Sequence, residues 1–232
     1  MDRISGKHFW ELSHYLLWCI GIAHGDISIN NLMYDVVTRK GIVNDFDLAA
    51  LMEPGDISPQ KKGWERTGTK PFMALELLDN ADGSVKRRYR HDLESFAWCL
   101  LWCGMNESFP DKTINGSTRD VFDSKRSLAF DLLKKTSAKP SFKEIWQCIV
   151  DWVQTWVMRF NLSMPGNALR LMFPISVPKD DREFVREFAK ILHRYELPIP
   201  LDDPQLKWID FQVPLQAPSS SKDRDVIVSY TS

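Results

Sequence analysis

The segment that most restricts how this chain folds is a run of apolar residues from Phe96 to Cys103, without a charged side chain. The run lies within 89–105, a stretch long enough for more than four turns of helix. A helix that is apolar on all sides is buried inside a protein, and this run is far shorter than the ~20 residues that cross a membrane. The sequence therefore predicts a central, buried helix over 89–105.

Three further segments have the one-sided apolar spacing of helices. The first is 8–23, and the last begins at Asp180. Between them, Ser141 and Glu144 have the pattern of a capping box, which predicts a helix that starts at Ser141. We expect the tryptophans of the predicted helices to pack in the core: Trp98, Trp102, Trp146, Trp152 and Trp156.

Between the first helix and the central helix, the sequence has the pattern of a small β-hairpin. Two short apolar runs, 32–37 and 41–43, are separated by Thr38-Arg39-Lys40. Residues 52–71 contain three glycines and three prolines, which predict a long loop. Helices combined with one small hairpin predict an α+β, mainly helical fold.

The length of 232 residues is that of one domain, or at most two. We predict a single domain over 1–210 and a mobile tail over 211–232, where serine and charged residues are frequent. The chain is 44% hydrophobic, so wholesale disorder is excluded.

The charges of the chain are nearly balanced, with 30 Lys and Arg against 31 Asp and Glu. A balanced chain is not expected to bind nucleic acid or a membrane surface. The N-terminus has no apolar segment of the signal-peptide type, which predicts an intracellular protein, cytoplasmic or nuclear. We expect the four cysteines to be buried thiols: Cys19, Cys99, Cys103 and Cys148.

Two groups of basic residues stand out: Lys61, Lys62 and Arg66 in the predicted loop, and Lys86-Arg87-Arg88 with Arg90 before the apolar run of the central helix. We expect these side chains to form a solvated face and not a nucleic-acid patch, because the charges of the whole chain are nearly balanced. The alternative is that they favour acidic protein substrates.

Three polar residues lie in the loops around the predicted hairpin. Asp26 and Asn31 precede it, and Asp45 follows its second run. Because the two ends of a hairpin meet, this order predicts two oxygen ligands and a free carboxylate at one end of a small sheet. Mg²⁺ is bound by one or two such protein oxygens together with phosphates, and a free carboxylate can accept the proton of a substrate hydroxyl.

Four motifs carry a resemblance to a known family. The segment His24-Gly-Asp26-Ile-Ser-Ile-Asn-Asn31 resembles the catalytic loop of the protein-kinase superfamily, and Asn44-Asp45-Phe46-Asp47 resembles its metal-binding segment. The segment Gly68-Thr69-Lys-Pro-Phe-Met-Ala-Leu-Glu76 is similar to the kinase segment that binds the peptide. With Arg90-His-Asp92-Leu-Glu-Ser-Phe96, these motifs resemble the fungal-type protein kinase family over roughly 8–200.

The resemblance implies a protein kinase that transfers the γ-phosphoryl group of ATP to Ser or Thr hydroxyls of a protein substrate. It implies that Asp26 is the catalytic base and that Asn31 and Asp45 bind Mg²⁺ and take part in catalysis. It also implies that Met33 lies under the adenine of ATP.

The resemblance further implies supporting residues. Thr69 would contact Asp26 and shape the peptide site, and Glu76 would pair with an arginine further along the chain. Asp92 would hold the backbone of the catalytic loop. His24 would have a structural role and pack near Phe46.

The sequence departs from the kinase pattern most clearly before His24. Only 23 residues precede it, no G-x-G-x-x-G occurs, and Lys7 has no kinase-like context. We therefore expect a C-terminal lobe without its N-terminal lobe, complemented by an upstream polypeptide or a partner chain. Two further departures are Gly25, where many kinases carry Arg, and Asp47 in place of Gly.

Three functions remain open from the sequence. The first is a protein kinase that is weak or inactive by itself. The second is a non-catalytic module that binds a partner protein. The third is a small-molecule phosphotransferase of the aminoglycoside or choline type, which shares the His-Gly-Asp and Asp-Phe-Asp motifs.

Overall fold

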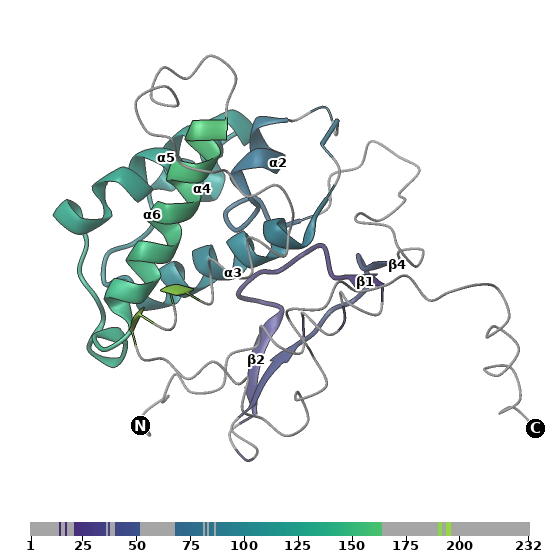
Figure 1. Cartoon of the computed structure of the whole chain (residues 1–232), viewed down its shortest axis with the longest axis horizontal. Coiled ribbons are helices and arrows are strands. Elements are labelled where there is room, and N and C mark those ends of the chain that lie inside the picture. The colour runs from purple at the N-terminus through teal and green to yellow at the C-terminus, as the bar shows by residue number, and fades with distance from the viewer. Residues whose placement is uncertain are drawn as a thin grey trace, which may run out of the picture.

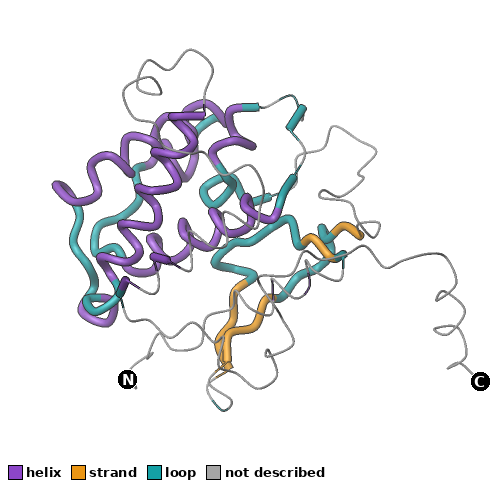
Figure 2. Tube along the Cα trace, viewed as in Figure 1, coloured by secondary structure: helices purple, strands orange, loops and turns teal. Residues whose placement is uncertain are grey.

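The computed structural model describes residues 21–35, 37, 40–51, 68–80, 82, 84–85, 87–163, 190–191 and 194–195, together with His14 and Leu17. In this part, helices form a packed body and short strand pairs lie at one side of it (Figure 1, Figure 2). The strands are β1 (Ile22–Ala23), β2 (Leu32–Asp35), β3 (Lys40–Val43) and β4 (Ala50–Leu51). The helices are α2 (Leu75–Asp79), α3 (Tyr89–Gly104), α4 (Asp111–Asn115), α5 (Thr118–Lys135) and α6 (Trp146–Ser163), with a 3₁₀ turn at Pro140–Phe142. The predicted α+β class is confirmed.

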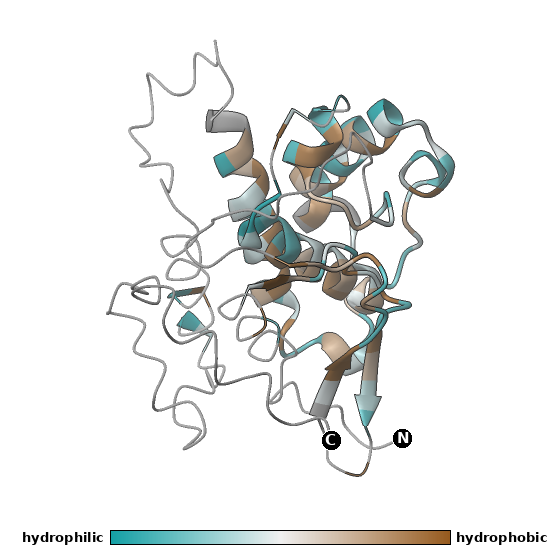
Figure 3. Cartoon of the chain, turned by 90° about the vertical axis from the view of Figure 1, so that its right-hand side faces the viewer, coloured by the Kyte–Doolittle hydropathy of each residue, from teal (hydrophilic) through white to brown (hydrophobic). Residues whose placement is uncertain are grey.

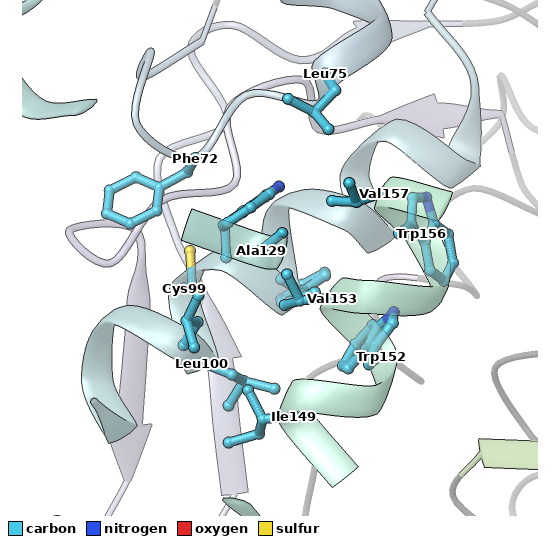
Figure 4. Packing of buried hydrophobic residues seen from close by; sticks show 14 of the residues in the cluster. Phe72, Leu75, Cys99, Leu100, Ala129, Ile149, Trp152, Val153, Trp156 and Val157 are labelled. Atoms are coloured by element: carbon cyan, nitrogen blue, oxygen red, sulfur yellow. The ribbon is translucent and has the colours of Figure 1, made fainter. Parts of the chain in front are cut away.

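The predicted central helix is α3, and every residue from His91 to Leu101 is buried. α6 packs along α3, and α5 packs against α6 and α2. Figure 4 shows side chains of these helices pointing toward one another, with Leu100 of α3 beside Ile149 of α6. Burial of each such large apolar side chain contributes about 1.5–3 kcal/mol, so this cluster is a stable platform for the loops that adjoin it.

Helix α5 is absent from the predictions made from the sequence. Lys125 occupies the middle of its apolar stripe and interrupts the pattern. The start of the helix was readable, because Ser117 and Asp120 form a capping box. The buried apolar residues of α5 are Val121, Phe122, Leu128, Ala129 and Leu132.

The helix predicted from Ser141 exists, but its predicted start is wrong. Ser141 lies in the 3₁₀ turn, and α6 begins only at Trp146. The turn is held by a tertiary contact in which the ring of Phe142 packs against Gly104. The two residues are so close that a methyl group added at Gly104 would lie 2.9 Å from Phe142 Cδ1. Three of the predicted core tryptophans are buried, and Trp102 and Trp146 are partly buried against the core.

The predicted hairpin is confirmed as the antiparallel pair β2–β3, in which Met33 lies opposite Ile42. It extends from the helical body, as Figure 3 shows. β1 pairs with β4 in antiparallel fashion, with Ala23 opposite Ala50. This second pair joins the two ends of the segment 22–51, so the hairpin and its flanking loops form one closed unit.

Other predictions are corrected or lie outside the described residues. Ala23 belongs to β1 and not to the predicted helix over 8–23, of which His14 and Leu17 are described and helical. Most of the predicted loop over 52–71, most of the helix from Asp180 and the boundary at 210 lie outside the described residues.

The cysteine prediction is correct in part. Cys99 and Cys148 are free and buried, whereas Cys103 is free and exposed because it lies on the outer side of α3 near its end. Cys19 lies outside the described residues. None of the helices described is long and apolar enough to cross a membrane.

Candidate active site

The candidate site is formed by residues 24–31, which connect β1 to β2, and by residues 44–46, which follow β3. The N–H of Asn44 donates a hydrogen bond to the C=O of Asn31 (2.8 Å), which extends the β2–β3 ladder by one step. The antiparallel pairing thus places the residues before β2 beside those after β3, as the sequence predicted.

Asp26 is half-buried, and its carboxylate is held from two sides. Its Oδ1 accepts hydrogen bonds from the N–H of Thr69 (2.8 Å) and from Thr69 Oγ1 (2.9 Å). Asn31 Nδ2 donates to the C=O of Asp26 (2.8 Å) and lies 3.5 Å from Asp26 Oδ2. The carboxylate is therefore fixed through one oxygen, while the other has a single long contact among the described residues.

His24 is buried and bonds to backbone on both sides of its ring. Nε2 lies 2.9 Å from the C=O of Asn44, and Nδ1 accepts from the N–H of Asp26 (3.3 Å). Burial lowers the pKa of His24, and the hydrogen bond that His24 donates to the C=O of Asn44 opposes this shift. The Phe46 ring lies 4.8 Å from the His24 ring. A neutral imidazole that donates from Nε2 and accepts at Nδ1 links the two loops and has no nitrogen left for a substrate.

Asn31 and Asp45 differ in their surroundings. Asn31 is buried, and its Nδ2 is used by Asp26, so its Oδ1 remains as an acceptor. Asp45 is exposed and has a φ of 61°, a left-handed conformation that is uncommon outside glycine and is tolerated best by Asn and Asp. Its carboxylate has no hydrogen bond to any described residue.

Met33 lies on β2 with 51% of its surface exposed, and Asn44 Nδ2 lies 3.6 Å from its sulfur. It is thus on the hairpin next to the site and open to a ligand. Asp47, which replaces the usual glycine, is also exposed.

Asp92, fully buried in the first turn of α3, ties that helix to the loop over 24–31. Its Oδ2 accepts from the N–H of Gly25 (3.4 Å) and lies 3.2 Å from His14 Nε2, and its Oδ1 lies 3.5 Å from Arg87 Nε. Burial opposes ionisation, but the charge of Arg87 and the hydrogen bond from His14 lower the pKa of Asp92 to about 2.

The prediction of a solvated basic face is wrong for Arg87 and Arg90, whose side chains are only 15% and 16% exposed. Arg87 lies between two glycines that both have positive φ, +83° at Gly25 and +134° at Gly68. A methyl group added at Gly25 would lie 3.0 Å from Arg87 Nη1, and one added at Gly68 would lie 3.5 Å from Arg87 Nη2. Glycine is therefore favoured there by backbone conformation and by the space that Arg87 occupies. Nothing in the sequence pattern connects these distant residues.

Glu76, on α2, has the arginine partner that the sequence could not assign. Its Oε2 accepts from Arg90 Nη2 (2.6 Å) and from His91 Nε2 (2.7 Å). His91 Nδ1 accepts from the N–H of Arg88 (3.0 Å), which fits a neutral imidazole protonated at Nε2. Burial correspondingly lowers the pKa of His91. Burial raises the pKa of Glu76, but the hydrogen bonds from His91 and Arg90 outweigh it and lower that pKa to about 2.

The substitution Glu76→Gln is expected to lower the free energy of unfolding by about 1–3 kcal/mol at neutral pH, since it removes charge-assisted bonds that join α2 to α3. The folded-state pKa of Glu76 lies below its ordinary value of 4.5, so its contribution is complete above that value and is lost as the pH falls toward about 2. Denaturant unfolding between pH 3 and 7 measures this, and the two proteins should converge in acid.

The matched control is Glu144→Gln, an exposed carboxylate in the turn before α6. It should leave the free energy of unfolding unchanged. A loss for Glu76→Gln that stayed constant down to pH 3 would contradict the assigned ion pair.

The donor set of Asn31 and Asp45 fits a magnesium ion shared with phosphates. The amide oxygen of Asn31 and the carboxylate of Asp45 have no described hydrogen-bond donor and are hard oxygen ligands, of which Mg²⁺ usually takes one or two from the protein. Among the described residues there is no cluster of three or more His, Cys, Asp or Glu side chains that would hold a metal by itself.

The region that carries the site is similar in sequence to a protein kinase family. Residues 13–104 match a family model described as fungal protein kinase. The match ends at the last residue of α3 and includes every candidate site residue named above. No curated protein matches the chain. The match covers part of the chain and supports a kinase-type function at a coarse level.

Proposed function

We propose that this protein is a serine/threonine protein kinase in which Asp26 accepts the proton of a substrate hydroxyl as the γ-phosphoryl group of ATP is transferred. The observation that carries the proposal is the asymmetry of the Asp26 carboxylate, whose Oδ1 is held by both donors of Thr69. A general base must be fixed in place and still keep an oxygen for the proton. Oδ2 meets that requirement.

Asn31 and Asp45 are the residues that would hold Mg²⁺ in the proposed site. When bound, the metal would neutralise charge on the ATP phosphates. Asn31 has a second role, because its Nδ2 donates to the backbone C=O of Asp26 and so leaves its Oδ1 for the metal. Met33, exposed on β2, would contact the adenine.

We also propose that the described residues form the C-terminal lobe of a kinase and that the segment 69–76 lies along the protein substrate. Thr69 would then link substrate position to Asp26. Efficient phosphoryl transfer depends on positioning of the nucleotide, so the proposal includes a nucleotide-clamping lobe from an upstream polypeptide or a partner chain.

The substitution Asp45→Asn is expected to weaken binding of Mg-ATP about 10- to 100-fold, because it removes a charged ligand of the proposed metal. Isothermal titration calorimetry of the two proteins with Mg-ATP measures this. Asp123→Asn, an exposed carboxylate on α5, is the control and should bind like the wild type. Equal binding by Asp45→Asn would exclude the proposed metal ligand.

A second function, a non-catalytic module that binds a partner protein, is favoured by exposed apolar side chains on the strands and on the turn between β2 and β3. Met33, Val37, Ile42 and Leu51 are 51%, 86%, 46% and 81% exposed, respectively. Such groups of exposed apolar side chains are typical of protein interaction sites. Absence of Mg-ATP binding at millimolar concentration by the wild type would favour this function over the kinase.

A further inference from the structure

Two buried charged residues contact the segment 69–75, in which Thr69 holds Asp26. The proposed reaction does not use these two residues. Lys125 of α5 is 0% exposed, and Glu94 of α3 is 4% exposed. Charged side chains are almost never fully buried without a specific partner, so their contacts indicate what they do.

The two side chains bond to the backbone on either side of Ala74. Lys125 Nζ donates to the C=O of Met73 (2.5 Å), and Glu94 Oε1 accepts from the N–H of Leu75 (2.9 Å). Trp98 lies between them, since its Nε1 donates to Glu94 Oε1 (3.1 Å) and Lys125 Nζ lies 4.2 Å from its ring centre. Ala74 is the N-cap of α2 and has no capping side chain, so Glu94 of α3 takes that role.

Met73 connects this backbone segment to the candidate base. Its N–H donates to the C=O of Thr69 (3.1 Å), and a methyl group at Gly68 would lie 3.0 Å from its Cε. Thr69 in turn holds Asp26 Oδ1 through two hydrogen bonds. A continuous series of contacts therefore runs from Lys125 to Asp26.

The buried pair is costly to keep. Burial lowers the pKa of Lys125 to about 7, against the charge of Glu94, and burial raises the pKa of Glu94. Buried charged groups can often be replaced by apolar residues of similar volume without loss of stability. Stability of the fold is thus a weak reason for their presence.

We propose that Lys125 and Glu94 are positioning residues that fix the backbone of Met73–Leu75 and, through Thr69, the carboxylate of Asp26. The link to catalysis rests on the proposed function, whereas the positioning itself can be measured without activity.

The test is residue-resolved amide hydrogen exchange on the full chain, comparing wild type, Lys125→Met and the double variant Lys125→Met/Glu94→Gln. The double variant removes both charges and keeps side-chain volume and the acceptor for Leu75. We expect exchange at Phe72 and Met73 to rise about tenfold relative to exchange at Val153 in α6. The matched control is Leu132→Ala, which removes buried apolar volume from α5 and should change both sets by the same factor.

An unchanged exchange ratio in the double variant would overturn the proposal. Unfolding of both Lys125 variants would also overturn it, because the pair would then be a requirement of the fold. If the wild type transfers phosphate, the double variant should also raise the KM for a protein acceptor such as casein. If the wild type does not transfer phosphate, the proposed kinase function fails, and the exchange ratio still decides the positioning role.

Discussion

The variant Asp26→Asn is expected to lose phosphoryl transfer by about 100- to 10,000-fold, the range that a general base contributes. Asparagine keeps an oxygen that can accept both hydrogen bonds from Thr69, so the loop should retain its conformation. The loss therefore reports the missing proton acceptor and not a displaced loop. Transfer of labelled phosphate from Mg-ATP to casein measures the rate, and thermal unfolding checks that the melting temperature is unchanged.

The control for this experiment is Asp123→Asn, which removes one negative charge from an exposed position on α5. It should transfer phosphate at the wild-type rate. Equal and measurable rates for Asp26→Asn and the wild type would exclude Asp26 as the base and would leave the protein-binding function as the better account of the site.

The variant Asp92→Asn is expected to cost about 3–5 kcal/mol of unfolding free energy, the largest stability effect that we predict. The change removes a fully buried carboxylate that faces Arg87 and His14 and accepts the N–H of Gly25. Denaturant unfolding at neutral pH measures the loss. Ser95→Ala is the control, because Ser95 is buried on the same helix and bonds only to its own helix backbone, at His91.

The stability that Asp92 provides should also depend on pH. Its folded-state pKa of about 2 lies below the ordinary value of 3.8, which corresponds to roughly 2 kcal/mol of stability above that value. This stability is lost as the pH falls from about 4 toward 2. If Asp92→Asn and Ser95→Ala were equally stable at neutral pH, the buried ion pair would not anchor the loop.

Several parts of the structure followed from short sequence patterns. The apolar run within 89–105 predicted α3, and two apolar runs around a polar turn predicted the β2–β3 hairpin. Such patterns are local, because periodicity depends only on neighbouring positions of one helix or strand. The start of α6 was mispredicted because it depends on the packing of Phe142 on Gly104, and this contact joins residues that are far apart in the sequence.

The sequence by itself determined the types and order of the candidate site residues, because Asp26, Asn31 and Asp45 lie in motifs with fixed spacing. Only the tertiary structure decided how these residues are held. It places Arg87 between Gly25 and Gly68, pairs Glu76 with Arg90 and His91, and buries Lys125 behind Met73. Each of these contacts joins different segments of the chain. The sequence does not distinguish a charged residue that is solvated from one that is buried against a partner. Its surroundings are fixed only when the helices pack.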